Sequence, residues 1–233
     1  MSFVRSATIQ CVLALSLWGS CWVSGVPAQS ADQGIRIKAV RQAANSKTQV
    51  VTANDNVQIS YPARQLRARA DVAQYYIKEQ RLVMTGNVYV TQAGGNSLQG
   101  ENITYSIRTG QFWVMPKSGQ LVESVYNAVE NGKGRQNIII RSDLQEANSK
   151  TQVVIARNNV QISYPTQRLR AKAQLAQYYV KEQKLVLSGN VVAVQQGNSI
   201  QGEVLTYSIR QGQFVARPKT GGVVDSIYIV PEK

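Results

Sequence analysis

Apolar and polar residues alternate along most of the chain after residue 35. Val57, Ile59 and Tyr61, for example, are separated by Gln58 and Ser60. The same alternation is found at Leu66/Ala68/Ala70, Ile103/Tyr105/Ile107, Val160/Ile162/Tyr164, Leu169/Ala171/Ala173 and Leu205/Tyr207/Ile209. A period of two residues is typical of a strand with one face in a core and one in water. Because no convincing helical period competes with it, the sequence predicts an all-β protein.

Short polar segments separate the predicted strands. Asn54–Asn56, Lys78–Gln80 and Gly86–Asn87 are rich in the residues that favour tight turns, and each has a counterpart later in the chain. Asn and Gly adopt the backbone conformations that such turns require. We therefore expect turns between strands at these places.

The sequence contains a tandem repeat. Ala44–Val51 returns as Ala147–Val154, and Asn56–Pro62 returns as Asn159–Pro165. A weaker repeat inside each half favours antiparallel strands stacked in layers. We predict two antiparallel modules of the β-jellyroll or twisted β-taco type, which could also run on as one continuous elongated sheet. They comprise residues 35–129 and 138–231, and the polar, glycine-containing segment 130–137 is the predicted linker.

The N-terminus has the features of an export signal. A basic start at Met1–Arg5 is followed by the apolar run Ala7–Trp18, and Val26-Pro27-Ala28 fits the small-residue rule for cleavage. The run is too short to span about 30 Å of hydrocarbon as a permanent helix. We predict a cleaved signal peptide at residues 1–28 and a periplasmic location. A lipoprotein anchored at Cys21 is the alternative.

Composition excludes several classes of chemistry. The chain has no histidine, and its two cysteines, Cys11 and Cys21, both lie in the predicted signal peptide. Zinc sites of the Cys/His kind, disulfide scaffolds and histidine-based catalysis are therefore excluded. The repeated carboxylates Glu79/Glu182 and Glu101/Glu203 lie in predicted turns or at strand starts, so we interpret them as structural. We expect no enzyme, no cofactor and no metal.

The net charge of +13 narrows the choice of partners. Outside the cytoplasm, lipid phosphates, anionic glycans and lipopolysaccharide are the abundant polyanions, so we expect no nucleic-acid partner. Arg67, Arg69, Arg170 and Lys172 recur at matching places on two strands, where they could neutralise phosphate groups at the rim of a lipid site. A solvated, solubilising face explains them equally well.

The second module resembles the OstA/LptA-type domain. The resemblance is carried by Ile138–Asp143, Gly189-Asn190-Val191, Ser199–Glu203 and the strand that closes near Tyr207, and their order is found twice. Domains of this type in LptA, LptC and the N-terminal part of LptD move lipopolysaccharide across the periplasm. The resemblance implies a partly open β-jellyroll whose apolar interior accepts acyl chains, and modules that join end to end.

The resemblance implies a periplasmic, LptA-like bridge protein that shelters acyl chains between the inner and outer membranes. Its partners would be lipopolysaccharide or a similar glycolipid, LptC-like and LptD-like proteins, and further copies of itself. The residues expected to line the apolar groove are Val57, Ile59, Leu66, Ala68, Ile103, Tyr105, Val160, Ile162, Leu169, Ala171, Leu205 and Tyr207. From the sequence alone, simple core packing explains these residues better than an open groove.

Two other classes remain open at this point. An envelope glycan-binding module would bind delipidated polysaccharide as tightly as the intact glycolipid. A structural envelope protein that polymerises through its β-edges would form filaments without saturable lipid binding.

Overall fold

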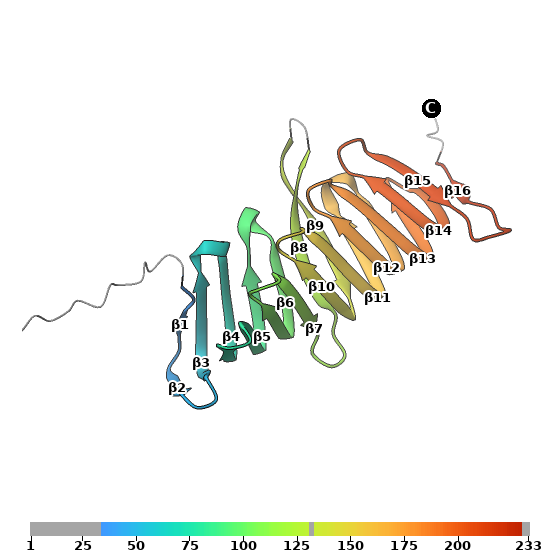
Figure 1. Cartoon of the computed structure of the whole chain (residues 1–233). Helices are drawn as coiled ribbons and strands as arrows, with labels where there is room; N and C mark the ends of the chain where they lie inside the picture. The colour runs from blue at the N-terminus through green and yellow to red at the C-terminus, as the bar shows by residue number, and fades with distance from the viewer. Residues whose placement is uncertain (1–33, 131–132, 230–233) are drawn as a thin grey trace, which may run out of the picture. The chain divides into compact units, whose positions relative to one another are not determined.

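The computed structural model describes residues 34–130 and 133–229, so the predicted signal peptide lies outside the described residues. The described residues form sixteen strands in one antiparallel sheet and three short 3-10 helices. Figure 1 labels the strands in chain order. The all-β prediction is confirmed. The helices are η1 (Pro62–Arg64), η2 (Ala93–Gly95) and η3 (Pro165–Gln167).

Eight long strands carry the architecture. The first half of the chain contributes β3 (Val50–Tyr61), β4 (Leu66–Tyr76), β5 (Arg81–Thr91) and β6 (Ser97–Ser106). The second half contributes β11 (Val153–Tyr164), β12 (Leu169–Tyr179), β13 (Lys184–Gln195) and β14 (Asn198–Ser208). The register between neighbouring long strands shifts near the middle of each pair, at a β-bulge. Each long strand therefore has two halves that pair separately.

The two sets of half-strands form two ladders, which we call layer 1 and layer 2. In layer 1 they pair with the short strands β2 (Arg41–Asn45), β7 (Gln111–Met115), β10 (Leu144–Asn148) and β15 (Gln213–Arg217). In layer 2 they pair with β1 (Arg36–Lys38), β8 (Val122–Glu130), β9 (Lys133–Ser142) and β16 (Asp225–Ile227). The bulges are the corners where the chain passes from one layer to the other.

The corners correct one sequence-based prediction. Gly86–Asn87 was expected to be a turn between strands, but both residues lie inside β5, with φ of 80° and 48°. Asp55–Asn56 in β3 likewise has positive φ at both residues. Consecutive left-handed residues bend a strand and increase its twist without ending its pairing, which is how a β-bulge turns a corner. Lys78–Gln80, in contrast, does form the turn between β4 and β5.

The two halves of the chain are joined by backbone hydrogen bonding in both layers. In layer 1, β7 pairs with β10, with Trp113 opposite Glu146. In layer 2, β8 pairs with β9, which pairs with β11. Residues 133–137, expected to be part of a linker, belong to β9, and Asn137 is paired with Asn127 of β8. The sheet is therefore continuous through the described part of the chain, and we retain the module limits as a proposal.

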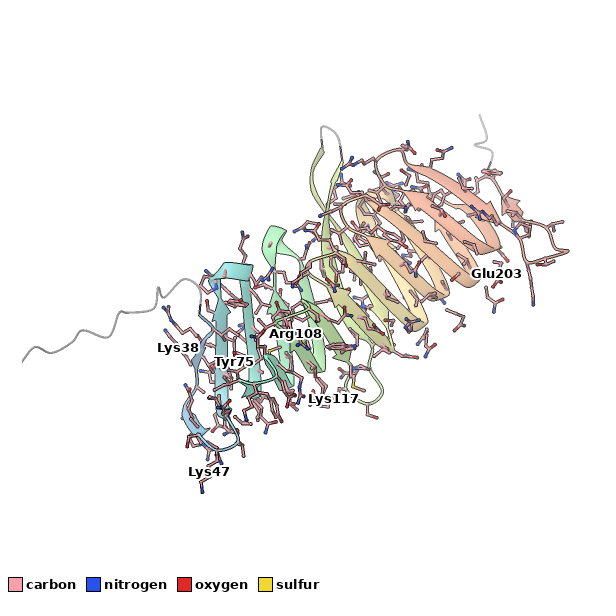
Figure 2. The ribbon with its side chains drawn as sticks, viewed as in Figure 1. Lys38, Lys47, Tyr75, Arg108, Lys117 and Glu203 are labelled. Carbon is pink, nitrogen blue, oxygen red and sulfur yellow. The ribbon has the colours of Figure 1, made fainter. Side chains whose placement is uncertain are left out.

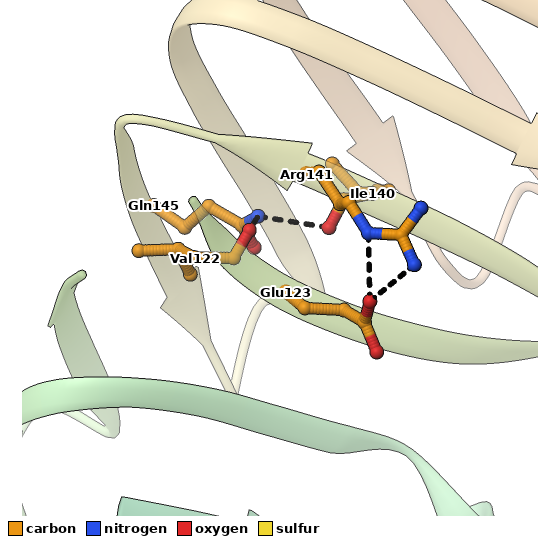
Figure 3. A network of polar contacts seen from close by, with 5 residues as sticks. All are labelled: Val122, Glu123, Ile140, Arg141 and Gln145. Atoms are coloured by element: carbon orange, nitrogen blue, oxygen red, sulfur yellow. Dashed lines mark hydrogen bonds and ion pairs between the residues drawn. The ribbon is translucent and has the colours of Figure 1, made fainter. Parts of the chain in front are cut away.

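A buried glutamine ties the layers together at this junction. Gln145 of β10 is fully buried, and its Nε2 donates hydrogen bonds to the carbonyl oxygens of Ile140 in β9 (3.0 Å) and Val122 in β8 (3.3 Å), as Figure 3 shows. Beside it, Arg141 of β9 forms an ion pair with Glu123 of β8, at 2.6 Å between Nη2 and Oε2. The two hydrogen bonds of Gln145 hold β10 of layer 1 against β8 and β9 of layer 2, and the ion pair joins β8 to β9 within layer 2.

The core lies between the two layers. Buried apolar side chains from both layers form a single cluster that extends through both halves of the chain. Tyr126 of layer 2 meets Tyr178 of layer 1 edge to face, with ring centroids 5.6 Å apart. The layers therefore share one interior, with the corners along one side and the chain reversals, including η1, η2 and η3, along the other.

Candidate functional site

The residues expected to line the apolar groove all point into this shared interior. None is more than 4% exposed: Val57, Ile59, Leu66, Ala68, Ile103, Tyr105, Val160, Ile162, Leu169, Ala171, Leu205 and Tyr207. They belong to the cluster between the layers. Along most of its length this interior is filled by the protein's own side chains, so any space for a ligand has to be sought where the packing is interrupted.

One such interruption is a cleft of about 210 Å³ at the junction of the two halves. Its layer 2 wall includes Leu66 and Tyr126, and its layer 1 wall includes Tyr105, Val154 and Val180. Its polar lip is formed by Arg64, Gln65, Gln92, Asn96, Asn148, Ser149 and Gln152. The cleft therefore lies on the side of the chain reversals, with an apolar floor and a polar entrance. Of the predicted groove residues, Leu66 and Tyr105 line it.

The floor of the cleft also contains the hydroxyl groups of two tyrosines. The hydroxyls of Tyr105 and Tyr126 are buried and have no hydrogen-bond partner of standard geometry. Burial raises the pKa of both, most strongly for Tyr126, and neighbouring Ser149 and Arg64 offset only part of the effect at Tyr105. Both groups therefore stay protonated near neutral pH and can donate a hydrogen bond to an acceptor that enters the cleft.

The ring of Tyr105 is held rigidly. It stacks on Phe112 of β7 with ring centroids 4.2 Å apart and planes inclined by 20°. Tyr207 stacks on Phe214 in the same way, at 4.3 Å and 24°. The first pair is fully buried, because the second half of the chain covers it, whereas Phe214 lies in β15, the last described strand of layer 1, and is half-buried.

The interior has a second opening beside Phe214. This hollow, of about 170 Å³, is lined by Ala193, Ile200, Phe214 and Tyr228 together with polar side chains of β13 and β14. Tyr228 is the counterpart of Tyr126 in the repeat, yet it is 70% exposed, whereas Tyr126 is 4% exposed. The C-terminal end of the layers thus shows the surfaces that the junction buries.

The four basic residues expected at a phosphate rim lie elsewhere. Arg67, Arg69, Arg170 and Lys172 are exposed and alternate with buried residues of β4 and β12, so they face outward from layer 2. None of the four lines the cleft, where the cation at the lip is Arg64. Their association with a lipid phosphate therefore stays a prediction, and it requires contact on the outer face.

Sequence reasoning missed Tyr126. The residue lies in a run in which Val122, Ser124, Tyr126 and Ala128 are all buried in β8. Val122, Tyr126 and Ala128 follow the period of two, but the buried Ser124 interrupts the apolar pattern. The alternation was thus a usable signal, weakened by one serine.

Other kinds of site find no support in the described residues. Between residues 34–130 and 133–229, no group of three or more Asp or Glu side chains is placed to hold a metal ion. The helices of that part of the chain are also too short and polar to cross a membrane.

Comparisons with known proteins identify the family. The family profile described as LptA/(LptD N-terminal domain) LPS transport protein matches residues 33–111 and 136–213. The crystal structure of LptH, the LptA homologous periplasmic component of the lipopolysaccharide transport device from Pseudomonas aeruginosa, aligns at 18% identity with a TM-score of 0.29. The alignment covers 85% of this chain and 96% of that chain. No curated protein sequence matches. With the profile matching both halves of the repeat, the chain belongs to the LptA/LptD N-terminal family of lipopolysaccharide transport proteins.

Proposed function

We propose that the protein shelters the acyl chains of lipopolysaccharide or a similar glycolipid between its two layers during transfer across the periplasm. The family is one of transport proteins and not of enzymes. The observation that carries the proposal is the cleft with an apolar floor and a polar lip, which opens into an interior shared by both halves of the chain.

Burial of methylene groups supplies the affinity. Each methylene removed from water contributes about 0.8 kcal/mol, so a tail of about ten methylenes gains about 8 kcal/mol before entropic costs. The cleft, at about 210 Å³, is larger than the apolar cavity of about 150 Å³ that can hold benzene in another protein. It therefore accepts part of a tail as it stands, and a longer tail requires the layers to separate at the lip.

The architecture allows such a separation. The layers are joined by backbone at the corners, whereas on the side of the cleft they meet through the residues of the lip and floor. Because the two halves of the chain have nearly the same interior, a tail would meet similar free energies in each, and no deep trap would hold it in either half. Net direction would have to come from partner proteins, which we propose to be LptC-like on the inner-membrane side and LptD-like on the outer-membrane side.

We propose that further copies, or these partners, dock on the terminal strands. At the internal junction β7 pairs with β10, and the repeat makes β15 and β2 their counterparts. The same register would place Val215 opposite Ala43 of the next copy. The free C-terminal end is apolar, because Val215, Ile227 and Ile229 are at least 50% exposed. Val125 and Asn127, the counterparts of Ile227 and Ile229 at the junction, are only partly exposed, so equivalent docking would cover Ile227 and Ile229. Trp113, the counterpart of Val215, is still 41% exposed there, so Val215 would stay partly accessible.

The docking register can be tested by disulfide trapping. With Cys11 and Cys21 replaced by serine, the pair A43C/V215C should give a ladder of oxidised oligomers on a non-reducing gel. The pair A43C/Q213C, two residues out of register, serves as the matched control. Equal ladders from both pairs would show random collision, and no ladder from the first would exclude this register.

The acyl-binding proposal is tested by photocrosslinking in cells. A benzophenone amino acid at Tyr126, on the floor of the cleft, should crosslink to the glycolipid. The control is Tyr76, also a tyrosine, which lies on the outer side of β4, where Arg81 stacks on its ring at 4.2 Å. Crosslinking that is absent at Tyr126, or equal at both positions, would refute the proposal. A glycan-binding module would instead bind the delipidated saccharide as tightly as the intact glycolipid.

A further inference from the structure

The outer face of layer 2 carries two hollows at equivalent positions of the repeat. The first, of about 520 Å³, lies over β1, β3, β4 and β5, and the second, of about 770 Å³, lies over β9, β11, β12 and β13. We call them groove 1 and groove 2. Both are widely open to solvent, so each could accept a group that is presented from outside the sheet. Their repetition follows from the repeat in the sequence, because equivalent outward-facing positions line both of them.

The walls of groove 1 are a regular array of cations. The pairing of β1 with β3 and of β3 with β4 places Arg36, Ser60 and Arg67 in one row across the strands. The next row contains Lys38, which Figure 2 labels on β1, then Gln58 and Arg69. Cations in one row are two strands apart, about 9–10 Å between backbones, and the rows are about 7 Å apart.

Among residues 34–130 and 133–229, no acidic side chain compensates the charge of groove 1. Its lining contains no acidic residue. Within the described part of the chain, Arg36, Lys38, Arg67 and Arg69 form no ion pair. Arg69 instead lies over the ring of Tyr89, at 5.5 Å from its centroid. A concave array of unpaired cations around Ser60 and Gln58 is suited to a multivalent anion, whose oxygens could accept hydrogen bonds from several of them at once.

Groove 2 repeats this pattern with fewer free cations, because Ile139 takes the place of Arg36. Arg170 and Lys172 take the places of Arg67 and Arg69, and Gln161 and Ser163 take those of Gln58 and Ser60. Arg141, the counterpart of Lys38, is paired with Glu123, so its charge is largely compensated. The exposed Val192 and Val194 replace Tyr89 and Thr91. Groove 2 therefore has the weaker positive potential and the more apolar wall.

Groove 1 begins at the lip of the cleft. Arg67 directly follows Leu66, which lines the cleft, and Arg64 stands at the lip three residues before Arg67. A ligand whose tails enter between the layers could extend its head over η1 onto the outer face within a few residues. The concave shape favours such a discrete anionic group over a flat bilayer surface.

We propose that grooves 1 and 2 bind the phosphate groups of the glycolipid's saccharide, so that the head group is held on the outer face of layer 2. This proposal rests on the proposed function only for the identity of the ligand. The grooves would bind the phosphorylated saccharide with or without its acyl chains, although the intact glycolipid would bind more tightly.

The test uses the full chain and a phosphorylated oligosaccharide prepared from the glycolipid by complete deacylation. Isothermal titration should show two sites per chain, and prior phosphatase treatment of the saccharide should abolish both. R67Q/R69Q and R170Q/K172Q should each remove one site, and the site lost with R67Q/R69Q should be the tighter of the two by about threefold or more. K78Q/K181Q, which removes two exposed charges from turns outside the grooves, is the matched control and should keep both sites.

Three outcomes would overturn the proposal. The first is that saccharide binding survives phosphatase treatment. The second is that K78Q/K181Q loses as much binding as the groove variants. The third is that vesicles of anionic phospholipid compete with the saccharide for the same sites. Crosslinking at Tyr126 separates this proposal from the proposed function. Two saccharide sites without crosslinking would uphold the grooves and refute acyl sheltering, whereas crosslinking without saccharide binding would do the reverse.

Discussion

The contribution of Gln145 to the junction can be measured with an unusually close control. Gln145 is fully buried, and its amide donates to two backbone carbonyls of layer 2. Its counterpart in the repeat, Gln42, occupies the same position on β2, the first described strand of layer 1, where it is exposed and donates to Ile37 O at 3.2 Å. The two residues thus differ mainly in whether another module is docked against them.

Replacing Gln145 by leucine removes both hydrogen bonds while keeping the volume of the side chain. Each net hydrogen bond is worth about 1 kcal/mol, and a buried carbonyl left without its partner costs about 1–3 kcal/mol. Removal of the unpartnered Oε1 of Gln145 offsets part of this loss. We expect Q145L to lower the free energy of unfolding by about 2–3 kcal/mol and the Tm by about 4–10 °C. Q42L should change the free energy of unfolding by less than about 0.5 kcal/mol.

Denaturant titration of the two variants, followed by circular dichroism, provides the measurement. Hydrogen exchange adds a spatial test, because protection in Q145L should fall first in β8, β9 and β10. Equal effects of Q145L and Q42L would refute the view that Gln145 stabilises a docked junction. A stabilised Q145L would show instead that the unpartnered oxygen costs more than the two hydrogen bonds contribute.

Two further predictions concern the interior and the corners. Burial raises the pKa of Tyr126 and Tyr178 in the folded protein. Above pH 10, which is about the pKa of tyrosine in the unfolded chain, the unfolded chain therefore loses these protons while the folded protein keeps them. The free energy of unfolding should then fall by about 1.4 kcal/mol per pH unit for each tyrosine. Urea titrations between pH 8 and pH 11 should show this slope, and Y126F/Y178F should flatten it; an unchanged slope would contradict the assignment. At the β13 corner, G189A combines a φ of +81° with a Cβ only 2.8 Å from Cβ of Gln174, so it should cost about 2–4 kcal/mol. G212A, with φ of +64° and nothing within 4 Å, should cost only about 1–2 kcal/mol, and equal thermal shifts would show that the contact is relieved.

The period of two was sufficient to predict which residues face the interior. Val57, Ile59 and Ile162 are buried as their positions in the alternation required. The pattern could not distinguish an open groove from a filled one, because both need an apolar inner face. That difference depends on the distance between the layers, which no local pattern encodes. The position of the cleft depends on Tyr126 and Val180, which line it together although they lie in different halves of the chain and are more than fifty residues apart.

The corners show why local turn chemistry was misleading. Gly86–Asn87 has the composition of a hairpin turn, and its backbone is indeed left-handed at both residues. Whether such a pair ends a strand or bends it depends on the partners, and here β4 and β6 pair with β5 on both sides of the bulge. In the same way, the polar residues 133–137 became a strand because β8 is available to pair with them. Pairing with strands that are distant in the sequence therefore decides whether such a segment forms a turn, a bend or a strand, and the local composition does not.

The corners also determine which interactions would have to be broken when a lipid enters between the layers. The angle between the layers is set by left-handed backbone at Asp55–Asn56, Gly86–Asn87 and their counterparts in the second half of the chain. The bend is therefore part of the covalent chain and does not depend on contacts between the layers. In the proposed function the two layers would part while both ladders of peptide hydrogen bonds remain closed, so only side-chain contacts between the layers would be replaced by contacts with the cargo. Amide exchange in the middle of the long strands should consequently be insensitive to cargo, and the protein would release a lipid without passing through any partly unfolded state.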